Sequence, residues 1–234
     1  MTKLLLTNDD GIEAPGLQAL TQAALPLGEC VVVAPAGAQS GCSHQVTTGR
    51  PFRIQSCGVN RYAVHGTPAD CTRLALHEFA KDLVWVLSGI NAGGNLGADI
   101  YISGTVAAVR EAVIHGRSGI AISHYLKRNL PVDWDRAARW TQRLLADLIA
   151  RGPTPGRFWS INLPHLKPDD PDPEVVFCPL DPNPLPLSYR PVEDGGWHYD
   201  GDYHNRPRRP GSDVDVCFSG RIAVTQITLL DPTV

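Results

Sequence analysis

Strand-like and helix-like segments alternate through the first 125 residues, and this alternation limits the fold more than any other feature of the sequence. Lys3–Thr7, Cys30–Ala34 and Leu83–Leu87 are short apolar runs, typical of strands that are buried on both faces of a sheet. Pro15–Leu25 lies between the first two, and its apolar residues recur at helical spacing. Apolar strands that alternate with helices predict an α/β fold, a mostly parallel sheet with helices on both faces.

The rest of the chain extends this pattern. Thr67, Pro68 and Asp70 are typical of a helix start, with an N-cap, a first-turn proline and a back-bonding acid. Asp133–Arg151 has apolar residues along one helical face. Ser88–Gly104 is rich in glycine and asparagine, and we expect a loop there. We also expect a hairpin formed by Phe52–Gln55 and Arg61–Val64, and a helix at 105–114. Further strands are expected at 119–123, 158–162 and 222–229.

Proline and glycine crowd residues 152–213, where Trp197, Tyr199 and Tyr203 stand among polar residues. A flexible linker is one interpretation, but the aromatic residues favour an ordered arm of loops and β-ribbon. We therefore expect three segments: a core at 1–165, an extended arm at 166–215, and a C-terminal strand at 216–234 that returns to the core or to a partner.

The composition argues against several classes of protein. The formal net charge is −3, whereas a protein that neutralises the phosphates of a nucleic-acid duplex is normally basic. No apolar run approaches the roughly 18 residues of a membrane span, and Leu4–Leu6 is too short for a signal peptide. None of the six cysteines forms a CxxC pair. We therefore expect a cytoplasmic protein with reduced thiols and no membrane partner.

The first strand runs directly into two carboxylates, Asp9 and Asp10, followed by Gly11. In open α/β sheets, ligands bind beyond the carboxyl ends of the strands. Two adjacent anions repel each other there unless a cation compensates, and oxygen ligands suit Mg²⁺, Mn²⁺ or Ca²⁺. A turn that merely leads into the next helix is an equal alternative for this segment taken alone, because aspartate often precedes glycine in turns.

Other loops are expected at the same sheet edge. Asn91 and Asn95 follow a buried strand, and their amide oxygens are neutral metal ligands. Ser103, Gly104 and Thr105 open a helix, whose N–H groups and hydroxyls suit a phosphate, although simple N-capping is the favoured interpretation of this segment taken alone. A third loop contributes Ser40, which is unremarkable alone.

Four segments together resemble the successive motifs of the SurE family, the stationary-phase survival proteins. They are TNDDGIEAPGL, APAGAQSG, GTPADC and SGINAGGNLGADIYISGTVAAVREA, and they cover about residues 1–125. The resemblance continues more weakly at 158–162 and 211–214. It implies a metal-dependent phosphatase that hydrolyses nucleoside 5'- and 3'-monophosphates, and in some members short polyphosphate.

The resemblance also implies a fold and a site. The family has a Rossmann-like core with an extended β-ribbon arm, and its members form homodimers or homotetramers by exchanging segments. One divalent cation per subunit, Mg²⁺ or Mn²⁺, is expected. The implied metal ligands are Asp9, Asp10, Ser40 and Asn91, and the implied phosphate-binding residues are Asn95, Ser103, Gly104 and Thr105.

Catalysis is then assigned to Asp9, Asp10 and Asn95, with charge stabilisation as the main demand. We favour attack by water, and an aspartyl-phosphate on Asp9 or Asp10 is the alternative. His44 is the nearest candidate for a general acid, although a structural histidine is the favoured interpretation.

Two functions from other classes compete with the phosphatase. A receiver-like signalling domain would need an acid at residues 50–57, which read RPFRIQSC. A nucleotide-binding module without catalysis stays open, because phosphate-binding loops serve both purposes.

Overall fold

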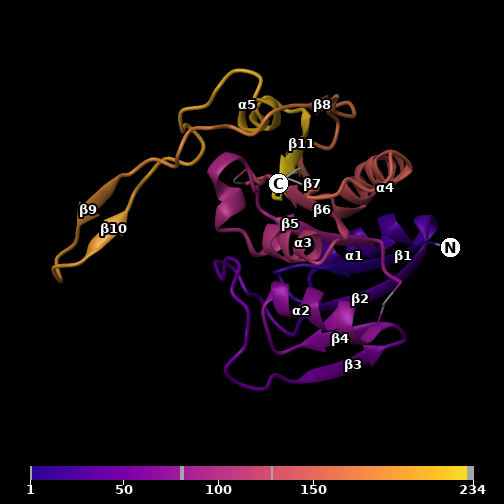
Figure 1. Ribbon diagram of the computed structural model, residues 1–234. Coiled ribbons are helices and arrows are strands. Elements are labelled where there is room, and N and C mark those ends of the chain that lie inside the picture. Colours follow the sequence, from indigo (N-terminus) through magenta and orange to yellow (C-terminus); the bar gives the residue numbers. More distant parts are fainter. Residues whose placement is uncertain (1, 80–81, 128, 231–234) are drawn as a thin grey trace.

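A nine-stranded sheet runs through the part of the chain that this computed structural model describes, residues 2–79, 82–127 and 129–230 (Figure 1). The strand order in space is β3-β4-β2-β1-β5-β6-β7-β11-β8, in which β3 and β11 run antiparallel to β4 and β7. The strands are β1 (Lys3–Thr7), β2 (Glu29–Pro35), β3 (Ile54–Gly58), β4 (Arg61–Val64), β5 (Trp85–Ala92), β6 (Ser118–His124), β7 (Arg157–Leu163), β8 (Val175–Phe177) and β11 (Ile222–Thr228). The predicted α/β fold with a mostly parallel sheet is confirmed.

Helices cover both faces of this sheet, because successive side chains of a buried strand point to opposite sides. On one face, Leu4 and Leu6 pack in the same core as residues of α1 (Pro15–Ala24) and α4 (Trp134–Ala150). On the other face, Leu5 packs with residues of α2 (Pro68–Leu74), and α3 (Gly104–Ile114) lies beside α2. Three short helical turns complete this set: η1 (Leu25–Leu27), η2 (Ala75–Phe79) and η3 (Gly97–Tyr101).

The helix start predicted at Thr67–Asp70 is confirmed, and the helix predicted at Asp133–Arg151 is present as α4. At α2, the Thr67 hydroxyl accepts from the Asp70 N–H while the Asp70 carboxylate accepts from the Thr67 N–H. At α4, Asp133 is the N-cap and its carboxylate accepts from the Arg136 N–H at 2.8 Å. The predicted hairpin is also present, as β3 and β4.

The predicted loop at Ser88–Gly104 is wrong at both ends. Strand β5 continues to Ala92, beside β6, and η3 begins at Gly97. Gly89 explains the first difference: a Cβ at this position would lie 2.2 Å from the backbone oxygen of Ile122 in β6. A glycine-rich composition therefore permits close strand packing here, where it suggested a loop.

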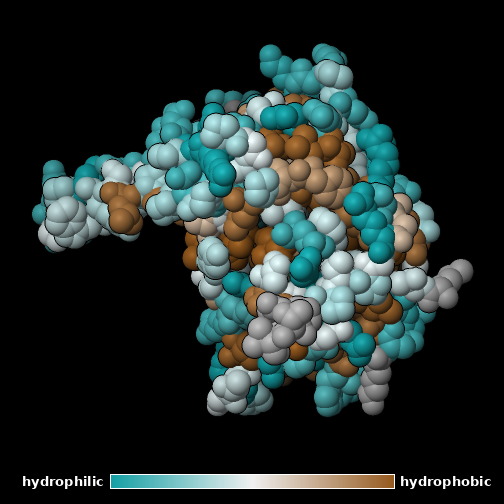
Figure 2. Space-filling model, turned by 45° about the horizontal axis from the view of Figure 1, so that its top comes forward, coloured by the Kyte–Doolittle hydropathy of each residue, from teal (hydrophilic) through white to brown (hydrophobic). Residues whose placement is uncertain are grey.

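The proline-rich segment forms an arm, as predicted. Strands β9 (Tyr189–Pro191) and β10 (Trp197–Tyr199) pair antiparallel and project from the body (Figure 1). Figure 2 shows that hydrophilic residues dominate the visible surface of the arm. A short helix, α5 (Asp213–Phe218), follows the arm and was not predicted. The three predicted segments stay a prediction, and β8, inside 166–215, pairs with β11 of the main sheet.

The topology decides where ligands can bind. Strands β1, β2 and β5 are parallel neighbours, so their carboxyl ends at Thr7, Pro35 and Ala92 lie at one sheet edge. Among the described residues, no helix has the length and apolar character to cross a membrane.

Candidate functional site

The acidic pair lies in a tight turn at the end of β1. The Asn8 side chain closes this turn, because its amide donates to the Gly11 carbonyl at 2.9 Å and its oxygen accepts the Gly11 N–H. Asp9 is only 6% exposed, and its carboxylate accepts the Thr105 hydroxyl at 2.6 Å. The Asp10 carboxylate accepts the Ala92 N–H at 3.1 Å, which ties β1 to the end of β5. Both carboxylates are therefore held by neighbouring loops.

Helix α3 begins directly against Asp9. A Cβ added at Gly104 would lie 2.9 Å from both the Cβ and Oδ2 of Asp9, so only glycine fits there without movement. Ser103 is the N-cap, and its hydroxyl accepts the Val106 N–H at 3.1 Å. The N-terminus of the helix therefore faces the Asp9 carboxylate. The positive end of the helix dipole favours a negative charge at this position.

Ser40 comes from the loop after β2. This loop is attached to the acidic turn by the Gln39 N–H, which donates to the Asp9 carbonyl at 2.7 Å. Gly41 follows with φ +77°, a backbone conformation that favours glycine. The turn therefore holds Ser40 next to Asp9.

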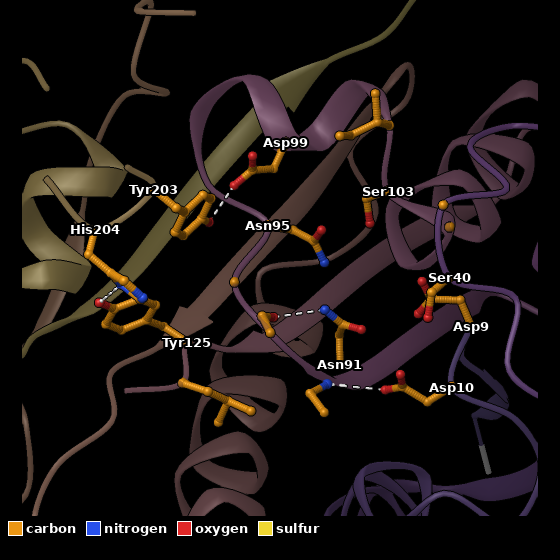
Figure 3. A pocket seen from close by; sticks show the side chains of 17 residues that line it. Asp9, Asp10, Ser40, Asn91, Asn95, Asp99, Ser103, Tyr125, Tyr203 and His204 are labelled. Carbon is orange, nitrogen blue, oxygen red and sulfur yellow. Dashed lines mark hydrogen bonds between the residues drawn. The ribbon is translucent and has the colours of Figure 1, made fainter. Parts of the chain in front are cut away.

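The two asparagines are fixed through their amide groups. Asn91 donates from Nδ2 to the Gly93 carbonyl at 2.8 Å, which leaves its side-chain oxygen to face the acidic pair (Figure 3). Asn95 donates from Nδ2 to the Ser123 hydroxyl at 2.8 Å, and its backbone N–H and carbonyl bond the side chain of Asn162. Asn95 is therefore oriented by β6 and β7.

One cavity of about 420 Å³ joins these loops (Figure 3). Seven of the eight predicted site residues line it: Asp9, Asp10, Ser40, Asn91, Asn95, Ser103 and Gly104. The eighth, Thr105, is fully buried behind Asp9 and directs its hydroxyl to that carboxylate. The Thr105 side chain therefore orients the Asp9 carboxylate, and the phosphate contact predicted for Thr105 stays a prediction.

The opposite end of the cavity is aromatic, and the sequence did not indicate it. Tyr125, Tyr203 and His204 line this end, together with Asp99. The Tyr203 hydroxyl donates to Asp99 at 2.6 Å, and Tyr125 and His204 share a hydrogen bond of 2.7 Å. The first contact joins residues that are 104 positions apart in the sequence and the second joins residues that are 79 positions apart, so no local motif could have revealed them.

Arg206 supports this aromatic end from behind. Its guanidinium lies 4.3 Å from the Tyr203 ring centroid and donates to both the Asp99 carboxylate and the Leu96 carbonyl. The side chain is buried, and the ion pair with Asp99 spans 3.3 Å. The chain returning from the arm is thereby fastened to the loop that carries Asn95.

Asp9 is electrostatically unusual. Burial raises its pKa to about 6, and the neighbouring charge of Asp10 adds to this, while hydrogen bonds from Thr105 act in the opposite direction. A buried carboxylate beside a second carboxylate is stabilised in its charged form by a cation.

The donor set fits a hard divalent cation. Two carboxylates, a hydroxyl and an amide oxygen converge, and all four are oxygen ligands of the kind that Mg²⁺ and Mn²⁺ prefer. Within the described ranges, no group of three or more His, Cys, Asp or Glu side chains could hold a metal.

His44 lies outside the cavity lining. Its Nε2 contacts the Glu111 carboxylate of α3 at 2.8 Å. This contact with α3 supports the structural interpretation of His44.

Comparison with known proteins agrees with this geometry. The family model described as survival protein SurE matches residues 4–181. The chain belongs to the SurE family. A relative from Nostoc sp. is 54% identical over 96% of this chain and 98% of its own length. A second, from Allorhizobium ampelinum, is 36% identical over 97% of this chain and 91% of its own, and is named 5'-nucleotidase SurE.

The SurE protein from Aquifex aeolicus has the same fold. Its crystal structure superposes with a TM-score of 0.87 at 28% identity, over 99% of this chain and 95% of that one. The predicted SurE resemblance and fold are thus confirmed.

Proposed function

We propose that this SurE-family chain is a metal-dependent 5'-nucleotidase that hydrolyses nucleoside monophosphates to nucleoside and phosphate. The names of its relatives support the reaction. The observation that carries the proposal is the two-ended cavity, with convergent oxygen ligands at one end and aromatic side chains at the other (Figure 3). A nucleoside monophosphate has the matching polarity, because a charged phosphate and a flat aromatic base stand at opposite ends.

We assign the metal ligands to Asp9, Asp10, Ser40 and Asn91. A Mg²⁺ or Mn²⁺ ion there would supply charge compensation for the carboxylates and for a phosphoryl group, and would lower the pKa of a water. The carboxylates are already oriented, Asp9 by the Thr105 hydroxyl and Asp10 by the Ala92 N–H. Little reorganisation is then required when substrate binds.

We assign phosphate binding to Asn95 and to the start of α3 at Ser103 and Gly104. The remaining amide hydrogen of Asn95 is free to donate to a phosphate oxygen, since the other is held by Ser123. Ser103 and Gly104 line the cavity at the N-terminus of α3, where the helix dipole favours an anion. A water would attack phosphorus in line with the leaving nucleoside oxygen.

The aromatic end gives a reason for preferring nucleotides to simple phosphate esters. Tyr203 is held by Asp99 and Arg206, so it offers a rigid surface for stacking of a base. We further propose that 3'-monophosphates and short polyphosphate are accepted.

The arm supports an oligomeric protein. Trp197 is 72% exposed and Tyr189 57% exposed on the hairpin, and large exposed aromatic residues are typical of interfaces. We propose a homodimer or homotetramer, and light scattering on purified protein would measure its mass. We also propose a cytoplasmic location.

The decisive experiment is phosphate release from AMP by the purified protein with Mn²⁺ or Mg²⁺, and again after EDTA treatment. We expect turnover that EDTA abolishes and added metal restores. No turnover with several nucleotides and both metals would refute the enzymatic proposal and leave a nucleotide-binding module.

A further inference from the structure

Glu111 is a buried carboxylate that the proposed reaction does not use. It lies in the second half of α3 and its side chain is 3% exposed. Three basic side chains contact it: Arg73 at 2.8 Å, His44 at 2.8 Å and His115 at 2.9 Å. A buried charge persists only when it is paired in this way.

The hydrogen bonds outweigh the effect of burial. Burial alone would raise the pKa of Glu111, but the bonds from His44, Arg73 and His115 hold it at about 2. Glu111 is therefore ionised at neutral pH, and its three partners all contact α3 at this one carboxylate.

The three partners differ in what they attach. His115 lies one turn further along the same helix, and Arg73 lies on α2, so neither reaches the cavity. His44 belongs to the loop that carries Ser40, and it meets Glu111 across 67 positions of sequence. Within the described residues from Gln39 to Gln45, His44 is the side chain of this loop that contacts a charged group.

Other contacts bracket the same turn. On one side, Gln39 donates to the Asp9 carbonyl; on the other, the Ser43 hydroxyl donates to the Tyr101 carbonyl at 3.1 Å. Ser40 and Gly41 stand between these anchors, without regular secondary structure. The position of Ser40 therefore depends on how firmly both sides are held.

Helix α3 thus holds two parts of the site at once. Thr105 in its first turn holds Asp9, and Glu111 in its second half holds the Ser40 loop. Six residues separate them, about 9 Å along a helix axis. A rigid helix fixes the distance between these two attachments.

We propose that the Glu111–His44 pair is a positioning device that fixes Ser40 against the acidic pair and so sets the affinity of the metal site. This inference rests on the proposed assignment of Ser40 as a metal ligand. His44 and Glu111 are positioning residues, because they act through the loop.

The test compares two histidines that share one carboxylate. His44→Ala and His115→Ala each remove an imidazole from Glu111, but only the first frees the Ser40 loop. Titration calorimetry with Mn²⁺ should show a dissociation constant about tenfold weaker for His44→Ala, the range typical of groups that orient metal ligands. His115→Ala should stay within about twofold of the wild-type protein, and His44→Gln, which keeps an N–H donor, should recover much of the loss.

Hydrogen exchange in the metal-free protein provides an independent measurement. The amides of residues 40–43 should exchange faster in His44→Ala than in His115→Ala, with similar thermal unfolding temperatures. Equal Mn²⁺ affinity in the two alanine variants, whether both are normal or both weakened, would overturn the inference. If even the wild-type protein binds no Mn²⁺, the proposed metal site fails, and unchanged exchange at 40–43 would then separately refute the positioning role.

Discussion

The contact between Gly104 and Asp9 allows a sharp prediction for Gly104→Ala. The added methyl carbon would lie 2.9 Å from Oδ2 of Asp9, whereas ordinary contacts begin near 3.4 Å, so the carboxylate must move by roughly 0.5 Å. A displacement of about 1 Å in an active site costs on the order of 100-fold in rate, so half of that corresponds to about tenfold, or about 1.4 kcal/mol. We expect kcat/KM for AMP to fall at least tenfold.

Stability should change much less than activity. Overpacking costs about 1–3 kcal/mol, but replacing a helical glycine by alanine returns about 1 kcal/mol. Urea unfolding should therefore show a loss of about 0–2 kcal/mol. The assay is phosphate release from AMP at saturating Mn²⁺. Gly49→Ala is the control, because nothing lies within 4 Å of its added Cβ. Wild-type kcat/KM in Gly104→Ala would show that the position of Asp9 does not govern the reaction.

Three further predictions follow from the site. Asp9→Asn should abolish AMP hydrolysis with the fold retained on circular dichroism, and an active variant would exclude Asp9 from the reaction. In EDTA, the raised Asp9 pKa of about 6 means that the folded state binds the Asp9 proton more tightly than the unfolded state does. The protonated carboxyl therefore contributes up to about 3 kcal/mol to the free energy of unfolding below pH 4, and this contribution is lost as pH rises through 6. In urea unfolding, Asp9→Asn should lack this dependence on pH. His204→Ala should raise KM for AMP several-fold and leave KM for p-nitrophenyl phosphate unchanged, and equal changes for both substrates would remove the proposed role of the aromatic end.

The acidic end of the site was predictable because it depends on topology. Asp9 and Ser40 follow apolar strands and Asn91 lies near the end of one, and parallel strands bring their carboxyl ends to one edge. Local patterns in the sequence therefore located these residues at that edge. The same reasoning could not show that the Thr105 hydroxyl would turn to Asp9, because capping and ligand binding use the same residue types.

The aromatic end was not predictable from local patterns. Tyr203 and Arg206 stand in a proline-rich segment with no periodicity, and their partner Asp99 lies over a hundred positions earlier. The strand at Ser88–Ala92 was missed for a related reason. Glycine and asparagine favour loops, and only the packing of Gly89 against β6 makes them a strand.

The ion pair between Asp99 and Arg206 also has a consequence for synthesis. The two residues are 107 positions apart, so a ribosome adding roughly 5–20 residues per second makes the second about 5–20 s after the first. During that interval Asp9, Asp10, Ser40 and Asn91 have already been synthesised, whereas Tyr203 and His204 have not. The cavity is completed only after Tyr203 and His204 are made, when the chain has passed out along the arm and returned to the body.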